Sequence, residues 1–509
     1  MTKKEWIVII AVIIAVGGYL LIKKDPADLS NEKPSIISAP ESVSEPENIT
    51  EEKNNATGQN GEIKNVVLIT LDTVRADHYG FMGYPRNTTP FIDKLASEGT
   101  VFKNARTVVS ETGPSISSMF TGLYPFEHHV INNNIKLDGF HILPEYLKEL
   151  GYKTGGFVSA IYLNTMTQGF DRLDFEGDAT LGPEPGARRR SGDKTIGRAK
   201  EWLGQVSPDE KTFLWVHLFD AHLPFNSDIN YTENEGDRLS GDALINFWTK
   251  EQGAKLDFFT GNQKESLTKV MNQYDGELQF LDKQLETLYN FMEQGGYNKN
   301  TLWIITSDHG EGLGSHSYFG HFEQVYNEQL KTPIIFYNPG AKDGKTVDSL
   351  VENIDLLPTL ADLLGFKIQE HISGRSLVPL ISGLKDSIRN YVFSRRGETM
   401  KVGLNEFATK YLPVKNPQDE EFIGELYSLQ EDGYKLIYSP DNVGRDKFFD
   451  LKKDPNELEN LIDNPNMKAM AEDMKNMIRE ILNGNISAAD NAGAQPDKKL
   501  EEALRALGY

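Results

Sequence analysis

Residues 66–73 read VVLITLDT, an apolar β-type run that ends in the acid Asp72. A second run of this kind, residues 302–310, reads LWIITSDHG and carries Asp308 and His309 at its end. Buried parallel strands are near-continuous apolar runs, and the ligand sites of open α/β sheets lie beyond the carboxyl ends of their strands. Two strands that each deliver a metal-binding type of side chain therefore predict a cation site at one edge of a sheet.

Strand-like and helix-like segments alternate from residue 63 onward. The strand-like runs lie at 154–159, 213–218 and 332–337, and the helix-like runs at 90–96, 143–150 and 271–292. This alternation predicts an α/β fold with a mostly parallel central sheet sandwiched by helices. Shorter β-type pieces follow after about residue 383, and they predict a smaller C-terminal α+β subdomain.

The N-terminal region differs in composition from the rest of the chain. Residues 6–22 are an apolar run between two pairs of lysines, long enough to span a thin bilayer, with a cleaved signal peptide as the alternative. Residues 25–62 are rich in Pro, Ser, Glu and Asn and predict a disordered tether. We therefore expect a transmembrane anchor at 1–24, a catalytic domain at 63–384, and a C-terminal subdomain with a helical tail at 385–509. A single-pass membrane protein with its catalytic domain outside the cytoplasm is the expected location.

Composition excludes several classes of protein. The chain of 509 residues has a formal net charge of −22, which argues against general nucleic-acid binding because phosphate contacts need Lys and Arg. It has no Cys, so disulfides, thiolate metal sites and Cys nucleophiles are excluded. Residues 188–190, RRR, follow a loop rich in Gly and Pro. They predict a solvated loop tip, with contact to anionic lipid headgroups as the alternative.

A candidate nucleophile lies between the two acidic strand ends in the sequence. Residues 111–115, ETGPS, place a hydroxyl, that of Thr112 or Ser115, in a turn-rich segment. Further imidazoles follow at His222, His316 and His321. A hydroxyl, two acids and several His residues are the side chains that metal-assisted ester chemistry uses.

Eight segments together resemble the motifs of the sulfatase family of the alkaline phosphatase superfamily. They are DTVRADH at 72–78, TPFIDKLA at 89–96, TGPSISSMFTG at 112–122, DAHLPF at 220–225, YDGE at 274–277, SDHGE at 307–311, GRSL at 374–377 and LRALGY at 504–509. The resemblance covers nearly everything after the predicted tether. It implies an alkaline phosphatase-like fold and a sulfatase-family ester hydrolase or transferase. The implied substrates are sulfated or phosphorylated glycans or lipids.

The chain departs from the family's nucleophile signature, Cys or Ser-x-Pro-Ser-Arg, at two positions. Thr112 stands where classical sulfatases convert Cys or Ser to formylglycine, and Ile116 stands where they have Arg. A sulfated Thr has no elimination route, whereas a phospho-Thr can be attacked at phosphorus by water or an alcohol. We therefore expect a membrane-anchored branch with a Thr nucleophile, acting on phosphate or sulfate esters of envelope or extracellular molecules. Sulfuric ester hydrolysis without formylglycine, and non-catalytic binding of anionic glycans or lipids, are the alternatives.

The resemblance also implies a metal ion. One divalent ion would be bound by Asp72, Asp308, His309 and the oxygen of Thr112. Ca²⁺ is the ion that the family implies, and Mn²⁺, Mg²⁺ or Zn²⁺ could take its place. Thr73 stands where many sulfatases carry a second Asp, so this chain offers one carboxylate fewer.

Four further residues receive roles by the same resemblance. His222 or His316 would donate a proton to the leaving oxygen. His321 and Arg75 would hold substrate oxygens, the latter through its bidentate fork. For Arg75, a salt bridge below the site is the alternative.

Overall fold

The computed structural model describes residues 63–484 apart from gaps at 161–162, 164–165, 176–188, 227, 234–236, 343, 397–409 and 415–423. A central eight-stranded sheet has the order β11-β2-β10-β7-β1-β6-β4-β5. Its strands are β1 (Asn65–Leu71), β2 (Thr100–Phe102), β4 (Lys153–Val158), β5 (Arg172–Phe175), β6 (Thr212–Leu218), β7 (Thr301–Ser307), β10 (Ile334–Tyr337) and β11 (Thr346–Val347). β1 pairs in parallel with β6 and β7, and β10 is antiparallel to β7 and β2. The prediction of a mostly parallel sheet is confirmed.

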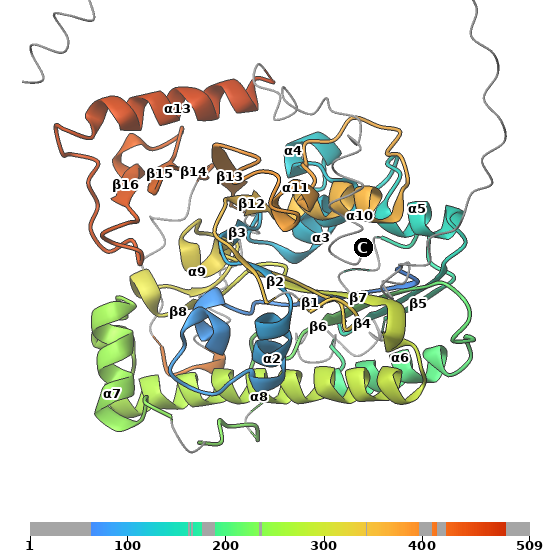
Figure 1. Ribbon diagram of the computed structural model, residues 1–509. Coiled ribbons are helices and arrows are strands. Elements are labelled where there is room, and N and C mark those ends of the chain that lie inside the picture. Colours follow the sequence, from blue (N-terminus) through green and yellow to red (C-terminus); the bar gives the residue numbers. More distant parts are fainter. Residues whose placement is uncertain are drawn as a thin grey trace, which may run out of the picture. The chain divides into compact units, whose positions relative to one another are not determined.

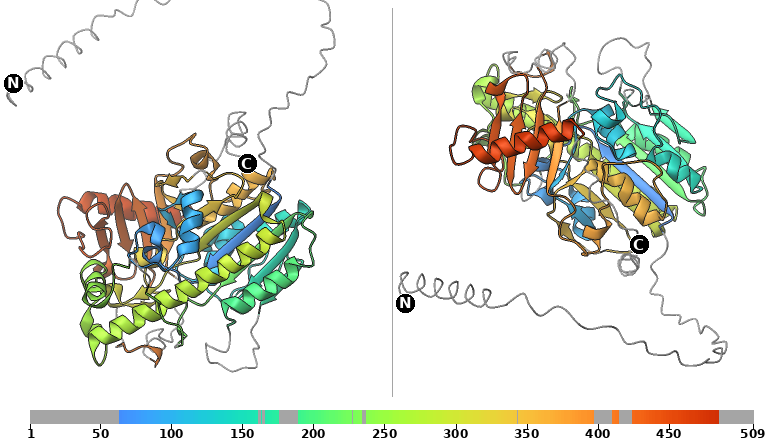
Figure 2. Two further views of the ribbon diagram at one scale, coloured as in Figure 1. Left: turned by 60° about the horizontal axis from the view of Figure 1, so that its bottom comes forward. Right: turned by 90° about the horizontal axis from the view of Figure 1, so that it is seen from above.

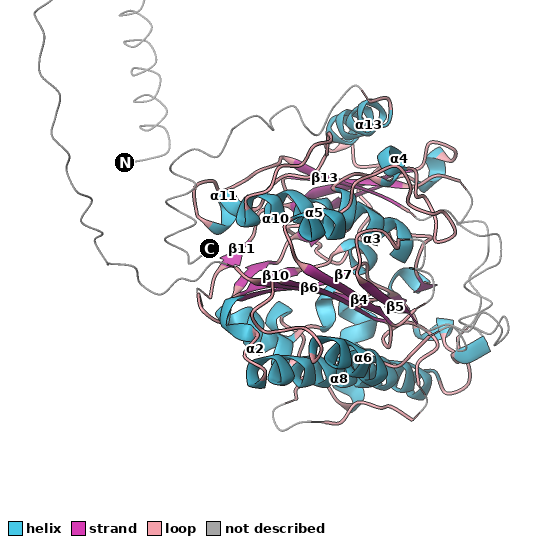
Figure 3. Cartoon of the chain, turned by 90° about the vertical axis from the view of Figure 1, so that its right-hand side faces the viewer, coloured by secondary structure: helices cyan, strands magenta, loops and turns pink. Residues whose placement is uncertain are grey.

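Helices cover both faces of this sheet (Figures 1 and 3). One face carries α2 (Pro90–Glu98), α6 (Gly192–Leu203) and α8 (Gln263–Gln294), and the other carries α3 (Thr112–Thr121), α5 (Leu143–Glu149), α10 (Leu356–Leu364) and α11 (Val378–Ile381). Side chains of a strand alternate between the two faces of its sheet. In β1, Val67 and Ile69 join the core beneath α2, α6 and α8, whereas Val66 and Leu68 join the core beneath α3 and α10. Burial on both faces explains why β1 is a continuous apolar run.

A second sheet, entirely antiparallel, follows in the C-terminal part of the described chain. Its strands β13 (Tyr391–Arg395), β14 (Tyr427–Glu431), β15 (Tyr434–Tyr438) and β16 (Lys447–Asp450) pair in sequence order. The helix α13 (Lys468–Leu482) packs on this sheet through Met474 and Ile478, which share a core with Phe393 and Leu436 (Figure 2). The predicted C-terminal α+β subdomain is confirmed. The domain boundaries stay a prediction.

Element ends follow ordinary capping chemistry. α2 begins at Pro90 and ends at Glu98, directly before Gly99, as its sequence predicts. α3 ends at Thr121 and is followed by Gly122, whose φ of 69° lies in the left-handed region that favours glycine. α8 begins at Gln263, earlier than the predicted 271–292. The prediction started late because the first residues of the helix are mostly polar and show little helical spacing of apolar side chains. The shorter elements are α4 (Pro125–His128), α7 (Gly241–Asn246), α9 (Asn327–Leu330) and the strand pairs β3 (Ala105–Arg106) with β12 (Val351–Glu352) and β8 (Gly312–Leu313) with β9 (Phe319–Gly320).

The prediction of a membrane-anchored location needs correction. Within the described ranges, no helix has both the length and the apolar composition needed to cross a bilayer. The longest described helix, α8, has 32 residues but carries charged side chains throughout its length. The predicted anchor at 1–24, the tether at 25–62 and the LRALGY segment at 504–509 lie outside the described residues.

Candidate active site

The register of neighbouring strands brings the predicted metal ligands together. Leu71 at the end of β1 is aligned with Ser307 at the end of β7. Asp72 and Asp308 therefore leave adjacent strands at the same edge of the sheet, and both are fully buried. His309 follows directly. One oxygen of each carboxylate and one ring nitrogen of His309 lie within 4.8 Å of one another.

The hydroxyl of Thr112 lies against this cluster, at the N-terminus of α3. Its Oγ1 donates to Asp72 Oδ2 at 3.3 Å and lies 3.2 Å from Nε2 of His309. Nδ1 of His309 lies 2.9 Å from the carbonyl oxygen of Gly310. Because a carbonyl can only accept, Nδ1 of His309 carries a proton. The four residues expected to bind the metal, Asp72, Thr112, Asp308 and His309, thus converge and form the Thr112 cluster.

The buried oxygens of this cluster fit a divalent cation. Asp72 Oδ1 and Asp308 Oδ2 have no hydrogen-bond partner among the described residues. Burial of an unpaired carboxylate oxygen is costly, and hard divalent cations prefer such ligands. Burial raises the pKa of Asp72, and burial together with Asp72 raises the pKa of Asp308 to about 6. Two oxygens and an imidazole nitrogen suit several divalent metals and do not select one.

The imidazoles of His321 and His222 lie beside the cluster, next to that of His309. The ring of His321 lies 4.5 Å from that of His309 and 4.9 Å from that of His222. Burial lowers the pKa of His222 to about 3, and its Nδ1 bonds to the carbonyl of Leu223. His222 is therefore neutral with an unprotonated Nε2, so it must gain a proton before it can donate one. Burial also lowers the pKa of His321, and its Nδ1 lies 3.3 Å from Glu311 Oε2.

The structure places Arg75 in a salt bridge rather than against Thr112. Its Nε and Nη2 donate to the two oxygens of Asp77 at 2.9 and 2.7 Å. Its Nη1 donates to the carbonyl of Glu311 and to Ser315 Oγ, each at 3.2 Å. These contacts agree with the salt-bridge alternative and do not support the expected role in holding substrate oxygens.

His316 also has its described contacts outside the Thr112 cluster. Nδ1 lies 2.7 Å from Glu328 Oε1, and Nε2 lies 3.0 Å from the carbonyl of Glu457. The ring stacks on Tyr326 at 3.7 Å. Both ring nitrogens are thus engaged by the protein, so of the two expected proton donors only His222 lies beside the cluster.

Sequence reasoning missed His217, on β6. Its Nε2 lies 3.3 Å from Asp72 Oδ2, and its Nδ1 lies 2.8 Å from Thr70 Oγ1. Burial lowers the pKa of His217 to about 4, so this ring is neutral. The signal that could have found it is an imidazole at an inward position of an otherwise apolar strand.

The basic run at 188–190 is not a solvated tip in its described part. Arg189 donates to the carbonyls of His222 and Pro224, and Arg190 pairs with Asp174 at 2.6 Å. The prediction is wrong for these two residues, because protein carbonyls and the Asp174 carboxylate engage their guanidinium groups; Arg188 lies outside the described residues. Arg189 thereby holds the turn that carries His222.

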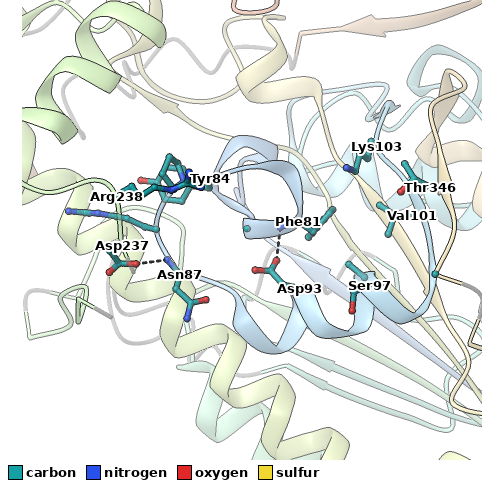
Figure 4. A pocket seen from close by; sticks show the side chains of 15 residues that line it. Phe81, Tyr84, Asn87, Asp93, Ser97, Val101, Lys103, Asp237, Arg238 and Thr346 are labelled. Carbon is teal, nitrogen blue, oxygen red and sulfur yellow. Dashed lines mark hydrogen bonds between the residues drawn. The ribbon is translucent and has the colours of Figure 1, made fainter. Parts of the chain in front are cut away.

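A pocket of about 570 Å³ with a mixed polar and apolar lining lies elsewhere, along α2 and the segment 80–87 (Figure 4). In this pocket Asp93 accepts a hydrogen bond from the backbone N–H of Phe81, and Asp237 accepts one from that of Asn87. None of its lining residues belongs to the Thr112 cluster. This pocket is therefore separate from the cluster of Asp72, Thr112, Asp308 and His309.

Comparison with known proteins identifies the family. Residues 64–366 match the model of the sulfatase family, and residues 408–484 match that of the N-sulphoglucosamine sulphohydrolase C-terminal region. An arylsulfatase of Clostridium perfringens is 23% identical over 487 residues, which cover 82% of this chain and 94% of that protein. The multifunctional alkaline phosphatase superfamily protein PehA of Trinickia caryophylli is 25% identical over 514 residues, covering 84% and 96%. The solved phosphonate monoester hydrolase of Agrobacterium radiobacter has a TM-score of 0.62 at 21% identity, covering 86% of this chain and 98% of that one.

The chain belongs to the sulfatase family, because the family match covers more than half of its length. The fold is that of the alkaline phosphatase-like sulfatases, as the resemblance implied. The expectation of a sulfatase-family ester hydrolase is confirmed at this level.

Proposed function

We propose that this protein is a metal-dependent hydrolase or transferase that uses Thr112 to attack phosphate or sulfate esters. One observation carries the proposal: the Thr112 hydroxyl lies 3.3 Å from Asp72 Oδ2 and 3.2 Å from His309 Nε2. The hydroxyl also belongs to the first residue of α3, where the helix dipole favours negative charge. The substrate class we propose is a sulfated or phosphorylated glycan or lipid, in keeping with relatives named as an arylsulfatase and a phosphonate monoester hydrolase.

The proposed reaction has two balanced displacements. A divalent ion held by Asp72, Asp308 and His309 would lower the pKa of the hydroxyl and neutralise charge on the ester. Thr112 Oγ1 forms a bond to phosphorus and passes its proton to Asp72 Oδ2, and the ester oxygen leaves with the bonding pair. His222, protonated once an anionic substrate raises its pKa, gives its proton to that oxygen. Water or an alcohol then passes its proton to His222 and attacks phosphorus, the bond to Thr112 Oγ1 breaks, and Oγ1 regains the proton held by Asp72.

A phosphate ester fits Thr112 better than a sulfate ester. A phospho-Thr intermediate can be released by a second attack at phosphorus, whereas the sulfatase route depends on an aldehyde hydrate that Thr cannot provide. Sulfuric ester hydrolysis without formylglycine stays the second candidate because the family match supports it. Non-catalytic binding of anionic glycans or lipids is the third.

The test uses the full chain and three chromogenic esters. Bound metal is measured first, followed by turnover of a p-nitrophenyl phosphodiester, p-nitrophenyl phosphate and p-nitrophenyl sulfate. Thr112→Ala should lower phosphodiester turnover roughly a thousandfold or more, and Thr112→Ser should keep part of it. The matched control is Ser117→Ala on the same helix, because the Ser117 hydroxyl contacts Met166 Sδ rather than the cluster.

Each outcome selects one candidate. Phosphodiester turnover that disappears in Thr112→Ala and survives in Ser117→Ala supports the proposal. Turnover of the sulfate ester alone supports the second candidate. Metal binding without turnover of any ester supports the third.

A further inference from the structure

Two polar side chains interrupt the apolar pattern on the sheet face that lies beneath α3. On β1, Val66 and Leu68 belong to the core of that face, and the next inward position is Thr70. On β6, Trp215 belongs to the same core, and the next inward position is His217. The strand register pairs Thr70 with His217, and both are fully buried. Polar residues at positions that the pattern assigns to apolar ones point to function.

A chain of hydrogen bonds runs from these residues to the metal ligand. The indole Nε1–H of Trp215 donates to Thr70 Oγ1 at 3.0 Å. An ionised carboxylate can only accept, so the contact with Asp72 Oδ2 requires the proton of the neutral His217 ring on Nε2, and Thr70 directs its own proton to His217 Nδ1, which lies 2.8 Å away. His217 Nδ1 then accepts, and its proton resides on Nε2. That N–H donates to Asp72 Oδ2 at 3.3 Å.

We propose that His217 is a positioning residue for Asp72, held by Thr70 in the tautomer that carries its proton on Nε2. Its N–H fixes Oδ2 of Asp72 and thereby turns Oδ1, which has no partner among the described residues, toward the metal position. Partners of metal ligands that fix orientation in this way are commonly worth 10- to 100-fold in metal affinity. The inference rests on the metal site of the proposed function. It goes beyond that function because a residue outside the proposed metal ligands, His217, would set the orientation of the Asp72 carboxylate.

The test measures the dissociation constant for Mn²⁺ by calorimetric titration of the metal-free full-length protein. Thr70→Val keeps the side-chain shape but removes the hydroxyl that sets the tautomer, and His217→Met removes the donor. Each should weaken Mn²⁺ binding by about 10- to 100-fold. Thr70→Ser keeps the hydroxyl, and His217→Gln keeps an N–H donor, so both should stay within about threefold of the wild-type constant. A residue with a merely structural role would not show this rescue.

The matched control is Thr306→Val on β7. Thr306 is the other register partner of Thr70, it is equally buried, and its hydroxyl donates to the carbonyl of Ser307. Its Mn²⁺ affinity should equal that of the wild type. Equal affinity in wild type, Thr70→Val and His217→Met overturns the inference, and so does a comparable loss in Thr306→Val. If His217→Met fails to fold in a thermal melt, Thr70→Val decides.

The same titration separates this inference from the proposed function. If wild-type protein binds Mn²⁺ and the Thr70 and His217 variants bind it equally well, only the positioning role fails. If wild-type protein binds no divalent ion, the metal-dependent function fails and the positioning role fails with it.

Discussion

Gly310 lies directly against the backbone carbonyl of Glu328, so closely that a Cβ on Gly310 would come within 1.9 Å of that oxygen. The Gly310 N–H donates to the carbonyl of Gln329 at 2.8 Å, and the Glu311 N–H donates to that of Glu328 at 3.1 Å. The chain that leaves β7 is thus clamped to the segment 328–329. Because His309 is the residue before Gly310, this clamp sets the direction of an expected metal ligand.

Gly310→Ala should therefore weaken both stability and metal binding. The added methyl group cannot fit unless one of the two backbone segments moves, and overpacking of this kind costs about 1–3 kcal/mol. Thermal unfolding and Mn²⁺ titration measure the two effects. The control is Gly197→Ala on α6, where a Cβ meets nothing within 4 Å and stability should hold or rise slightly. A Gly310→Ala protein as stable as wild type would show that the clamp gives way at no cost.

His316→Gln separates a proton donor from a structural histidine. If His316 were the general acid, its loss would lower kcat by about 10²- to 10⁴-fold. Its contacts to Glu328 and Glu457 instead predict a kcat close to that of the wild type. Steady-state kinetics on the chromogenic esters give the answer. A large fall in kcat without a change in fold would support His316 as the proton donor.

The same variant should change how stability depends on pH. Burial lowers the pKa of His316, but the neighbouring Glu328 outweighs this and raises it overall. A histidine whose folded pKa is raised stabilises the protein fully below its unfolded pKa of about 6.5, and this stabilisation is lost as pH rises through the folded value. Denaturant unfolding at about pH 6 and about pH 9 should therefore show a fall in the wild type that His316→Gln lacks. Identical pH dependence in the two proteins would contradict the pairing with Glu328.

Much of the candidate site could be predicted because it depends on strand ends. Asp72 and Asp308 each follow an apolar run, and neighbouring parallel strands end at a common edge of the sheet. His309 adjoins the second of these acids, and the choice of Thr112 followed from motif resemblance. The direction of Arg75 could not be predicted in this way, because it is set by Asp77, two residues along the chain, and by acceptors from a distant segment.

His217 shows a second limit of sequence reasoning. The strand 213–218 was recognised, but its neighbours in the sheet were not, so the pairing of His217 with Thr70 and Asp72 stayed hidden. Composition and periodicity identify an element, whereas contacts between elements decide what its side chains do.

Removal of Arg389 should be among the most destabilising single changes. Its guanidinium pairs with the carboxylates of Glu352 and Asp355, and all three side chains are buried. Tyr124 and the backbone N–H of Phe393 also bond to Glu352, so these charges join the main sheet region to the C-terminal sheet. Arg389→Met leaves two buried acids without their cation and should cost about 3–5 kcal/mol in the free energy of unfolding.

The control for that change is an exposed pair. Arg198 and Glu201 lie 3.2 Å apart on the surface of α6, with both side chains more than half exposed. Glu201→Gln should change the denaturant midpoint little, because solvent screens such pairs. Comparable losses in the two variants would mean that burial does not govern the effect.

Metal removal should reveal repulsion between Asp72 and Asp308. Burial and Asp72 raise the pKa of Asp308 to about 6, so its folded pKa exceeds its unfolded value. An acid whose folded pKa lies above its unfolded pKa costs no stability at low pH, where it is protonated in both states. The protein then loses stability as pH rises through the unfolded and the folded pKa. Metal-free protein should thus lose stability between about pH 4 and about pH 6, and Mn²⁺ at 100 times its dissociation constant should restore about 2.7 kcal/mol. Asp308→Asn should abolish both effects in chemical denaturation with and without chelator. A chelated wild type whose stability is constant across this pH range would mean that burial and Asp72 do not raise the pKa of Asp308, and that no cation is needed to hold the two carboxylates together.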